Sequence, residues 1–197
     1  MKVITLDRAG LARASKKLTE AVLASTFRPT HLLAIANGGV HIAREMTNHI
    51  ALDSSLLVVP ARRRSSEWKR GFHAATLLRR LPYFITDRLR VLEAHVFGRL
   101  RKSDTVDLSA PLPRDVSETL RSIRSPVPIR LLVVDDAVDS GRTLRRIVNG
   151  LRRVQDAGGE IRTAVITVTQ THPLIRPDFH LYHGVICRFP WSYDFRQ

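Results

Sequence analysis

Along the first sixty positions of this chain, segments with apolar residues at helical spacing alternate with short continuous apolar runs. Between Asp7 and about Ser25 apolar residues recur at helical spacing with charged residues between them, which predicts an amphipathic helix capped by Asp7. The short apolar run from His31 to Ala36 predicts a strand, followed by a glycine turn and a helix from Val40 to about His49. The run Leu56 to Val59 predicts another buried strand.

The same alternation returns after residue 128. The hydrophobic run Ile129 to Val134 predicts a central strand, buried on both faces, that stops at the acidic pair Asp135-Asp136. Helical spacing from Thr143 to about Ala157 predicts a helix, and the runs Ile161 to Thr169 and Val185 to Cys187 predict two more strands. Strands that alternate with helices indicate an α/β fold, in which a mainly parallel sheet has flanking helices and binds ligands at the carboxyl ends of its strands.

A basic segment interrupts this pattern from Ala61 to about Pro113. It is rich in arginine, and helical spacing recurs within it, as in Leu89, Leu92 and Val96. We expect two or three short helices here, forming a helical insertion or hood outside the sheet. The chain of 197 residues is long enough for one sizeable core, so we expect residues 1–197 to form a single domain with this insertion at about 61–113.

Charge and cysteine content restrict the class of protein. Thirty-two Lys and Arg against 18 Asp and Glu give a net charge of +14, which attracts phosphorylated small molecules, nucleic acid or anionic lipid. The alternative is a plain solvated basic surface. The lone Cys187 excludes an intramolecular disulfide, and the longest apolar runs are too short to span a bilayer. We therefore expect a soluble, cytoplasmic protein that does not bind membranes.

The residues from Asp135 to Thr143 carry the most specific chemistry. After the strand, the carboxylates of Asp135 and Asp136 suit the hydroxyls of a sugar, directly or through a metal-bound water. Backbone N–H groups at the following helix N-terminus, the hydroxyls of Ser140 and Thr143 and the small Gly141 suit a terminal phosphate. The alternative is an acidic strand end followed by an ordinary helix cap.

This stretch, Leu131 to Thr143, resembles the motif of type I phosphoribosyltransferases that binds 5-phosphoribosyl-1-pyrophosphate (PRPP). The resemblance implies the type I phosphoribosyltransferase fold and an enzyme that transfers the phosphoribosyl group to a nitrogenous base with Mg²⁺, releasing pyrophosphate. It also implies that Asp135 and Asp136 contact the ribose and hold the metal through water. We expect a homodimer. The implied PRPP-binding residues are Asp135, Asp136, Ala137, Asp139, Ser140, Gly141, Arg142 and Thr143.

Two further roles follow from the resemblance. Asn37, Gly38 and Gly39 lie after a strand, where the family has a pyrophosphate-binding loop, although such a pair is often only a turn. Asp139 corresponds to an Asp of the enzymes that act on 6-oxopurines, and as catalytic residue it accepts a proton from the base nitrogen. Alternatively, Asp139 only caps the helix that begins near Gly141.

The C-terminal sequence Arg188-Phe189-Pro190-Trp191 resembles the ending of xanthine/guanine/hypoxanthine-type enzymes, which implies that Phe189 and Trp191 contact the purine. The alternative is that both rings pack in the hydrophobic core or at a dimer interface. Purine members usually carry a Lys after the strand that follows the PRPP helix, but Val168 to Pro173 contains none. Gln170 or His172 would have to supply that hydrogen bond, so the acceptor base is open.

A second resemblance concerns the basic segment. Val59-Pro60 followed by Lys69-Arg70-Gly71-Phe72-His73 resembles a segment of competence-type phosphoribosyltransferase homologues, which are linked to DNA uptake. The insertion is alternatively a mobile loop that brings cations over the pyrophosphate, or a solvated helical face. The sequence therefore leaves three hypotheses: a 6-oxopurine transferase, a PRPP-binding regulator that binds nucleic acid, and a transferase with a non-purine acceptor.

Overall fold

The computed structural model describes residues 1–52, 56–60, 81–100, 111–123, 128–154 and 159–196. Its strands are β1 (Lys2–Thr5), β2 (His31–Ile35), β3 (Leu57–Val59), β4 (Arg130–Val138), β5 (Glu160–Val168), β6 (Phe179–His183) and β7 (Val185–Arg188). Its helices are α1 (Arg8–Ala24), α2 (Gly38–Thr47), α4 (Tyr83–Leu100), α5 (Arg114–Ser122) and α6 (Arg142–Arg152). The predicted cap of the first helix is confirmed, since the Gly10 amide donates to Oδ1 of Asp7 over 2.6 Å.

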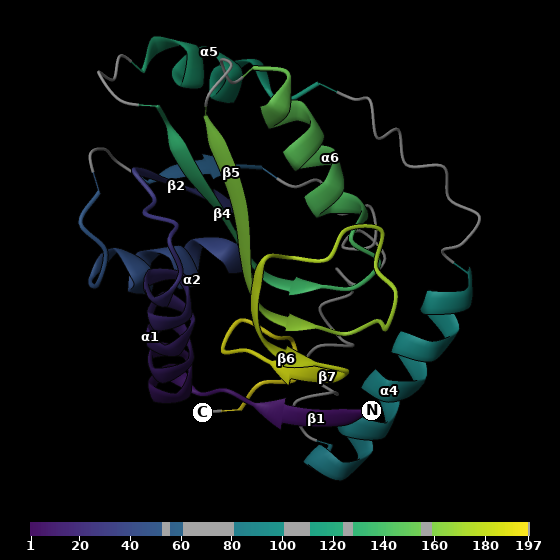
Figure 1. Cartoon of the computed structure of the whole chain (residues 1–197). Helices are drawn as coiled ribbons and strands as arrows, with labels where there is room; N and C mark the ends of the chain where they lie inside the picture. Colours follow the sequence, from purple (N-terminus) through teal and green to yellow (C-terminus); the bar gives the residue numbers. More distant parts are fainter. Residues whose placement is uncertain (53–55, 61–80, 101–110, 124–127, 155–158, 197) are drawn as a thin grey trace.

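The main sheet has five strands in the order β3-β2-β4-β5-β6, and every described pairing in it is parallel. Helices α1 and α2 cover one face, and α5 and α6 cover the other (Figure 1). The predicted α/β class with a mainly parallel sheet and flanking helices is confirmed. Because the strands are parallel, their carboxyl ends meet at one edge, where the loops after β2 and β4 emerge side by side.

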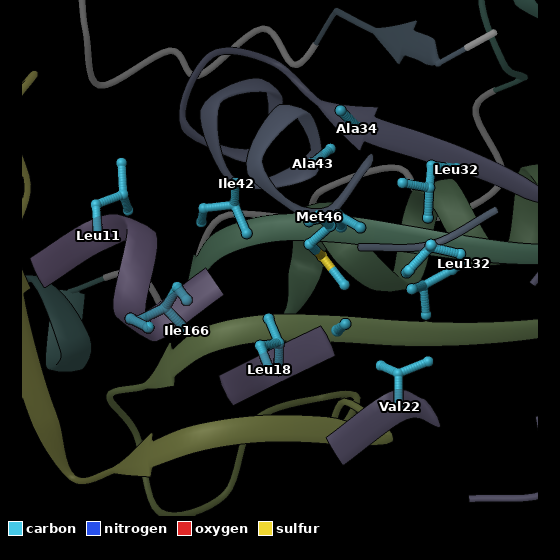
Figure 2. Close-up of a cluster of buried hydrophobic side chains, with 14 of the residues drawn as sticks. Leu11, Leu18, Val22, Leu32, Ala34, Ile42, Ala43, Met46, Leu132 and Ile166 are labelled. Atoms are coloured by element: carbon cyan, nitrogen blue, oxygen red, sulfur yellow. The ribbon is translucent and has the colours of Figure 1, made fainter. Parts of the chain in front are cut away.

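Alternate residues of the central strands face the two helical layers. On β2, Leu32 and Ala34 join the cluster under α1 and α2, whereas Leu33 and Ile35 join the cluster under α5 and α6. Figure 2 shows the first cluster, with Met46 of α2 between the helices and the sheet. This burial on both faces explains the continuous apolar runs of β2, β4 and β5. The prediction of a buried strand at Leu56 to Val59 was wrong, because β3 lies at the edge of the sheet and Val58 is 42% exposed.

A second, two-stranded sheet pairs the two ends of the chain. Strand β1 runs parallel to β7, with Lys2 opposite Val185 and Thr5 opposite Arg188. Helix α4 packs beside β1 (Figure 1) and belongs to the basic segment that we expected outside the main sheet. The rest of the predicted helical content around Ala74 to Leu78, and the segment Lys69 to His73, lie outside the described residues.

Three further predictions about the elements were wrong. Strand β4 does not stop at Asp135 but continues to Val138, because its backbone still pairs with β5 beyond the acidic pair. Helix α6 ends at Arg152 rather than near Ala157, in a turn where the Val154 amide donates to the Leu151 carbonyl. The sequence analysis also missed β1, β6 and α5.

Candidate active site

The predicted phosphate loop lies between the end of β4 and the start of α6. Gly141 is the N-cap of α6 and has a φ of +76°, a left-handed conformation that glycine adopts without strain. A Cβ on this residue would also lie 3.0 Å from the Ile175 amide nitrogen. No side chain caps the helix, so its first N–H groups remain for an anion at its positive end.

The segment that follows β5 packs against this loop. The Leu174 amide donates to the Ser140 carbonyl over 2.8 Å, and the guanidinium of Arg145 donates to the Leu174 carbonyl over 3.1 Å. Gln170, one of the two expected replacements for the absent Lys, is half-buried on the same segment, and His172, the other, is exposed. The loop therefore has a fixed wall built from residues about thirty positions further along the chain.

Asp139 is exposed and hydrogen-bonded to a residue at the end of β5. The Thr169 hydroxyl donates to Oδ1 of Asp139 over 2.7 Å. Because α6 has Gly141 as its N-cap and no side-chain cap, the alternative reading of Asp139 as a capping residue is wrong. Thr169 was missed from the sequence as a partner of Asp139, since only the parallel pairing of β4 with β5 brings the two together.

The acidic pair is buried at the carboxyl end of β4. Asp135 and Asp136 are 2% and 7% exposed, and Oδ1 of Asp135 accepts from the Asp136 amide over 2.9 Å. Carboxylates that are this well buried need hydrogen-bond donors or a cation close by. These two successive carboxylates at the carboxyl end of β4 are the hydrogen-bond acceptors of the site.

The predicted pyrophosphate loop lies directly against this pair. A Cβ on Gly38 would overlap the Asp136 carboxylate, and a Cβ on Gly39 would overlap the Val134 carbonyl. Both positions therefore require glycine, because the start of α2 packs directly on the Asp136 side chain and on the Val134 backbone at the end of β4. The Ala36–Asn37 peptide bond is cis, and Asn37 is exposed without capping α2. The structure thus brings residues 37–39 and 135–136 together, a hundred positions apart.

Trp191 connects the C-terminal segment to the acidic pair. Its Nε1 donates to Oδ2 of Asp136 over 3.2 Å, and its ring stacks on Phe189 and on His41 of α2, with centroid separations of 4.9 and 4.6 Å. Phe189 is 4% exposed and belongs to the core, which favours the core alternative for that ring. Trp191 is only half-buried. His41 was missed in the sequence, where nothing marked it apart from other helix residues.

Arg188 anchors the segment that carries Trp191. Its guanidinium is 1% exposed and donates to Asp194, to Asp87 and Thr86 of α4, and to Thr5 of β1, over 2.6 to 2.9 Å. Arg90 of α4 forms a second ion pair with Asp194. Burial alone would raise the pKa of Asp194, but hydrogen bonds and charge from Arg90 and Arg188 outweigh it and lower this pKa to about 2.

Three further observations concern cysteine, metal ligands and membrane-spanning helices. Burial raises the pKa of the Cys187 thiol to about 12, so this side chain is not a nucleophile at neutral pH. In the described ranges, no group of three or more His, Cys, Asp or Glu is placed to hold a metal ion by itself. The same ranges contain no helix with the length and apolar character needed to cross a bilayer.

The comparison with protein families finds one domain model over nearly the whole chain. Residues 6–195 match the model of the phosphoribosyl transferase domain. No curated protein matches the sequence significantly.

Solved structures with the same fold share little sequence with this chain. A purine phosphoribosyltransferase from Pyrococcus horikoshii superimposes with a TM-score of 0.59 at 16% identity, covering 100% of this chain and 97% of its own. A xanthine-guanine-hypoxanthine phosphoribosyltransferase from Helicobacter pylori gives 0.60 at 16% identity, with coverages of 98% and 95%. A Neisseria gonorrhoeae protein solved with bound ppGpp gives 0.57 at 15%, with coverages of 96% and 89%.

Proposed function

This chain belongs to the phosphoribosyl transferase family, and on that premise we propose that it transfers the phosphoribosyl group of PRPP to a nitrogen of a 6-oxopurine. One observation carries the proposal: the glycines at the start of α2 lie directly on the acidic pair at the end of β4, next to the uncapped N-terminus of α6. A pyrophosphate site, a ribose site and a phosphate site would then be adjacent, in the order that PRPP requires.

Each part of PRPP has matching groups. The 5-phosphate would accept hydrogen bonds from the backbone at Ser140 to Thr143, the ribose hydroxyls would meet the acidic pair, and the pyrophosphate would lie on the backbone of Gly38 and Gly39. The close packing of Gly38 on the Asp136 carboxylate supports this placement, since it puts the expected pyrophosphate loop directly beside the expected ribose contact.

The carboxylates of Asp135 and Asp136 suit a Mg²⁺ ion whose other ligands come mainly from the substrate. Oδ2 of Asp136 already accepts from Trp191 and Oδ1 of Asp135 from a backbone amide. The described residues therefore offer two carboxylates here, without a cluster of three or more ligands around them. Mg²⁺ commonly keeps several waters and uses one or two carboxylates with phosphate oxygens. When bound, it would neutralise the charge that develops on the leaving pyrophosphate.

The reaction exchanges one bond at C1 of the ribose. The C1–O bond to pyrophosphate breaks, the base nitrogen forms the new C1–N bond, and the proton lost from that nitrogen passes to Asp139. The Thr169 hydroxyl holds the Asp139 carboxylate through Oδ1, which leaves Oδ2 for the base. Trp191 would contact the purine, and Gln170 or His172 would replace the absent Lys as hydrogen-bond partner of its 6-oxo group.

A screen of acceptor bases tests the proposal. PRPP consumption is measured with Mg²⁺ against hypoxanthine, guanine, xanthine, adenine, orotate and uracil. Turnover with a 6-oxopurine supports the proposal; turnover with orotate or uracil alone would replace it with a non-purine transferase. PRPP binding without turnover on any base would favour the regulator.

A further inference from the structure

We propose that helix α4 positions Trp191 through the ion pairs that it makes with the C-terminal segment, and so sets the affinity of the site for the base. The residues of α4 that carry this role are Asp87 and Arg90, which pair with Arg188 and Asp194 rather than with Trp191 itself. They are therefore positioning residues. Their effect on base affinity rests on the function proposed above, whereas their effect on the position of the ring does not.

Trp191 lies near the middle of a short loop whose two ends are joined. Nε of Arg188 donates to Oδ2 of Asp194 over 2.9 Å, which closes the loop. Inside it, the Phe189 amide donates to Oγ of Ser192 over 3.0 Å, and the Ser192 amide donates back to the Phe189 carbonyl over 2.9 Å. The backbone that carries Trp191 is therefore tied to the ion pair at the ends of the loop.

Helix α4 holds both ends of this loop. Oδ1 of Asp87 accepts from Nη2 of Arg188 over 2.6 Å, and the guanidinium of Arg90 forms a two-point ion pair with the Asp194 carboxylate. The Arg188 and Asp194 side chains are only 1% and 6% exposed, so salt and water screen these pairs less than they screen surface pairs. A shift of α4 therefore moves both ends of the loop.

The face of α4 that packs on the protein is mainly polar. Four residues at helical spacing on one face of this helix contact Arg188 or Asp194: Tyr83, Thr86, Asp87 and Arg90. By contrast, Phe84 and Leu92 are 66% and 60% exposed. Among the α4 side chains that the structure describes, Thr86 alone is buried, and none belongs to either core cluster. Ion pairs and hydrogen bonds, more than apolar packing, therefore hold α4 in place.

The Trp191 ring needs this support, because its own contacts do not fix its plane. The hydrogen bond from Nε1 to Oδ2 of Asp136 fixes one point of the indole. Of the two rings stacked on it, His41 is exposed and Phe189 belongs to the same loop. The plane of the indole therefore follows the loop. A contact with a planar base requires that this plane be held by the surrounding residues.

The fluorescence of Trp191 tests the positioning directly. The sequence contains two tryptophans, so Trp68→Phe leaves Trp191 as the only one. In that background, Asp87→Ala combined with Arg90→Ala removes both ion pairs of α4 without changing the net charge. The emission of Trp191 should shift to longer wavelength and its quenching by acrylamide should increase, because the ring is less well held and more open to water.

The matched control is Arg114→Ala combined with Glu118→Ala in the same background. It removes the same two charges from exposed residues of α5, which covers the main sheet, and should leave the emission and the quenching of Trp191 unchanged. Asp87→Asn alone is a second variant that keeps the shape of the side chain. It should shift the emission in the same direction by a smaller amount. Circular dichroism establishes that each variant is folded.

Kinetics on the best base of the screen test the consequence for binding. Losing Asp87 and Arg90 should raise KM for the base about threefold and leave kcat within about twofold, because the contact with the base is weakened while proton transfer to Asp139 is not. In the Trp191→Ala background, the same two substitutions should raise KM for the base no further, because they act through Trp191.

Three results would overturn the inference. Trp191 fluorescence that is unchanged in the folded Asp87/Arg90 variant would mean that α4 does not position the ring, and an equal change in the control would attribute the effect to general destabilisation. Losses that multiply with that of Trp191→Ala would mean that the ion pairs act by another route. If no base is turned over, the proposed function fails, and the fluorescence comparison still decides whether α4 positions Trp191.

Discussion

Trp191 and Asp136 form a direct hydrogen bond, Nε1 to Oδ2 over 3.2 Å, across 55 positions of sequence. The expected base contact and the expected ribose contact are therefore joined in one pair. Removing the indole changes both at once, so its two roles have to be separated by the choice of substitution.

Two substitutions of Trp191 make that separation. Trp191→Ala removes the ring and should raise KM for the base about tenfold, in keeping with about 1–3 kcal/mol for aromatic stacking on a base. Trp191→Phe keeps a ring against Phe189 and His41 but loses the N–H donor to Asp136. It should leave KM for the base nearly unchanged and alter KM for PRPP. If the Trp191→Ala variant has an unaltered KM for the base, Trp191 has only a structural role.

Asp135→Asn combined with Asp136→Asn should abolish Mg²⁺-dependent PRPP binding, because neutral amides neither hold metal waters nor accept as strongly from ribose hydroxyls. Calorimetry with and without Mg²⁺ measures this. Circular dichroism of the double variant is needed alongside, since both side chains are buried. A folded double variant that binds PRPP with wild-type affinity contradicts the site.

Asp139→Asn should lower kcat about 10²–10⁴-fold with little effect on PRPP affinity, because proton transfer from the base is lost. Thr169→Val removes the hydroxyl that holds the Asp139 carboxylate and should lower kcat by about tenfold. Adding it to Asp139→Asn should then have almost no further effect, because Thr169 acts through Asp139. If the two losses in kcat multiply in the double variant, Thr169 does not act through Asp139.

Gly141→Ala should weaken PRPP binding, because a Cβ at this left-handed position strains the backbone and meets the Ile175 amide. Gly184→Ala is the matched control. Gly184 has a similar φ of +69°, but a Cβ there meets nothing within 4 Å. Both variants should lose about 1–2 kcal/mol of stability from the strain, and only Gly141→Ala should lose PRPP affinity in calorimetry. Equal loss of affinity in both would attribute it to global destabilisation.

Asp194 gives the protein a pH-dependent part of its stability. Its pKa of about 2 lies below the ordinary value of 3.8, so the folded state is favoured above pH 4 and loses this advantage as pH falls toward 2. The contribution is about 2 kcal/mol at neutral pH. Denaturant unfolding at pH 6 and pH 3 should show that Asp194→Asn costs roughly half as much at the lower pH. A pH-independent cost would mean that the ion pairs with Arg90 and Arg188 do not set this pKa.

Local patterns predicted most of the fold and the linear motif. The helix after Asp7, strands β2, β3, β4, β5 and β7, and the glycine turn before α2 follow from spacing and turn residues within a few positions. The sequence analysis missed β1 and β6 because neither contains a buried residue to mark it as an apolar run, and their strand character depends on partners elsewhere: β1 pairs with β7 from the other end of the chain. The end of β4 was misplaced because charged side chains do not interrupt backbone pairing.

The contacts between distant residues of the site could not be predicted from sequence patterns. Glycines at 38 and 39 were identified as a turn, but their need for bare backbone arises from the approach of Asp136 and Val134. The Thr169–Asp139 hydrogen bond likewise depends on the pairing of β4 with β5, and the stacking of His41 on Trp191 depends on the path of the C-terminal segment. Such contacts between distant residues follow only from the topology.

The pairing of β1 with β7 sets an order of events during synthesis. Lys2 to Thr5 are synthesised long before their partners Val185 to Arg188. The buried Arg188, which bonds to Thr5 and to α4, arrives with them. The nascent chain therefore carries β1 unpaired until β7 has been made, while the five-stranded sheet can already assemble through β5. Strand β1 precedes the other described strands in the sequence, yet it can be fixed in place only after the last of them has been made.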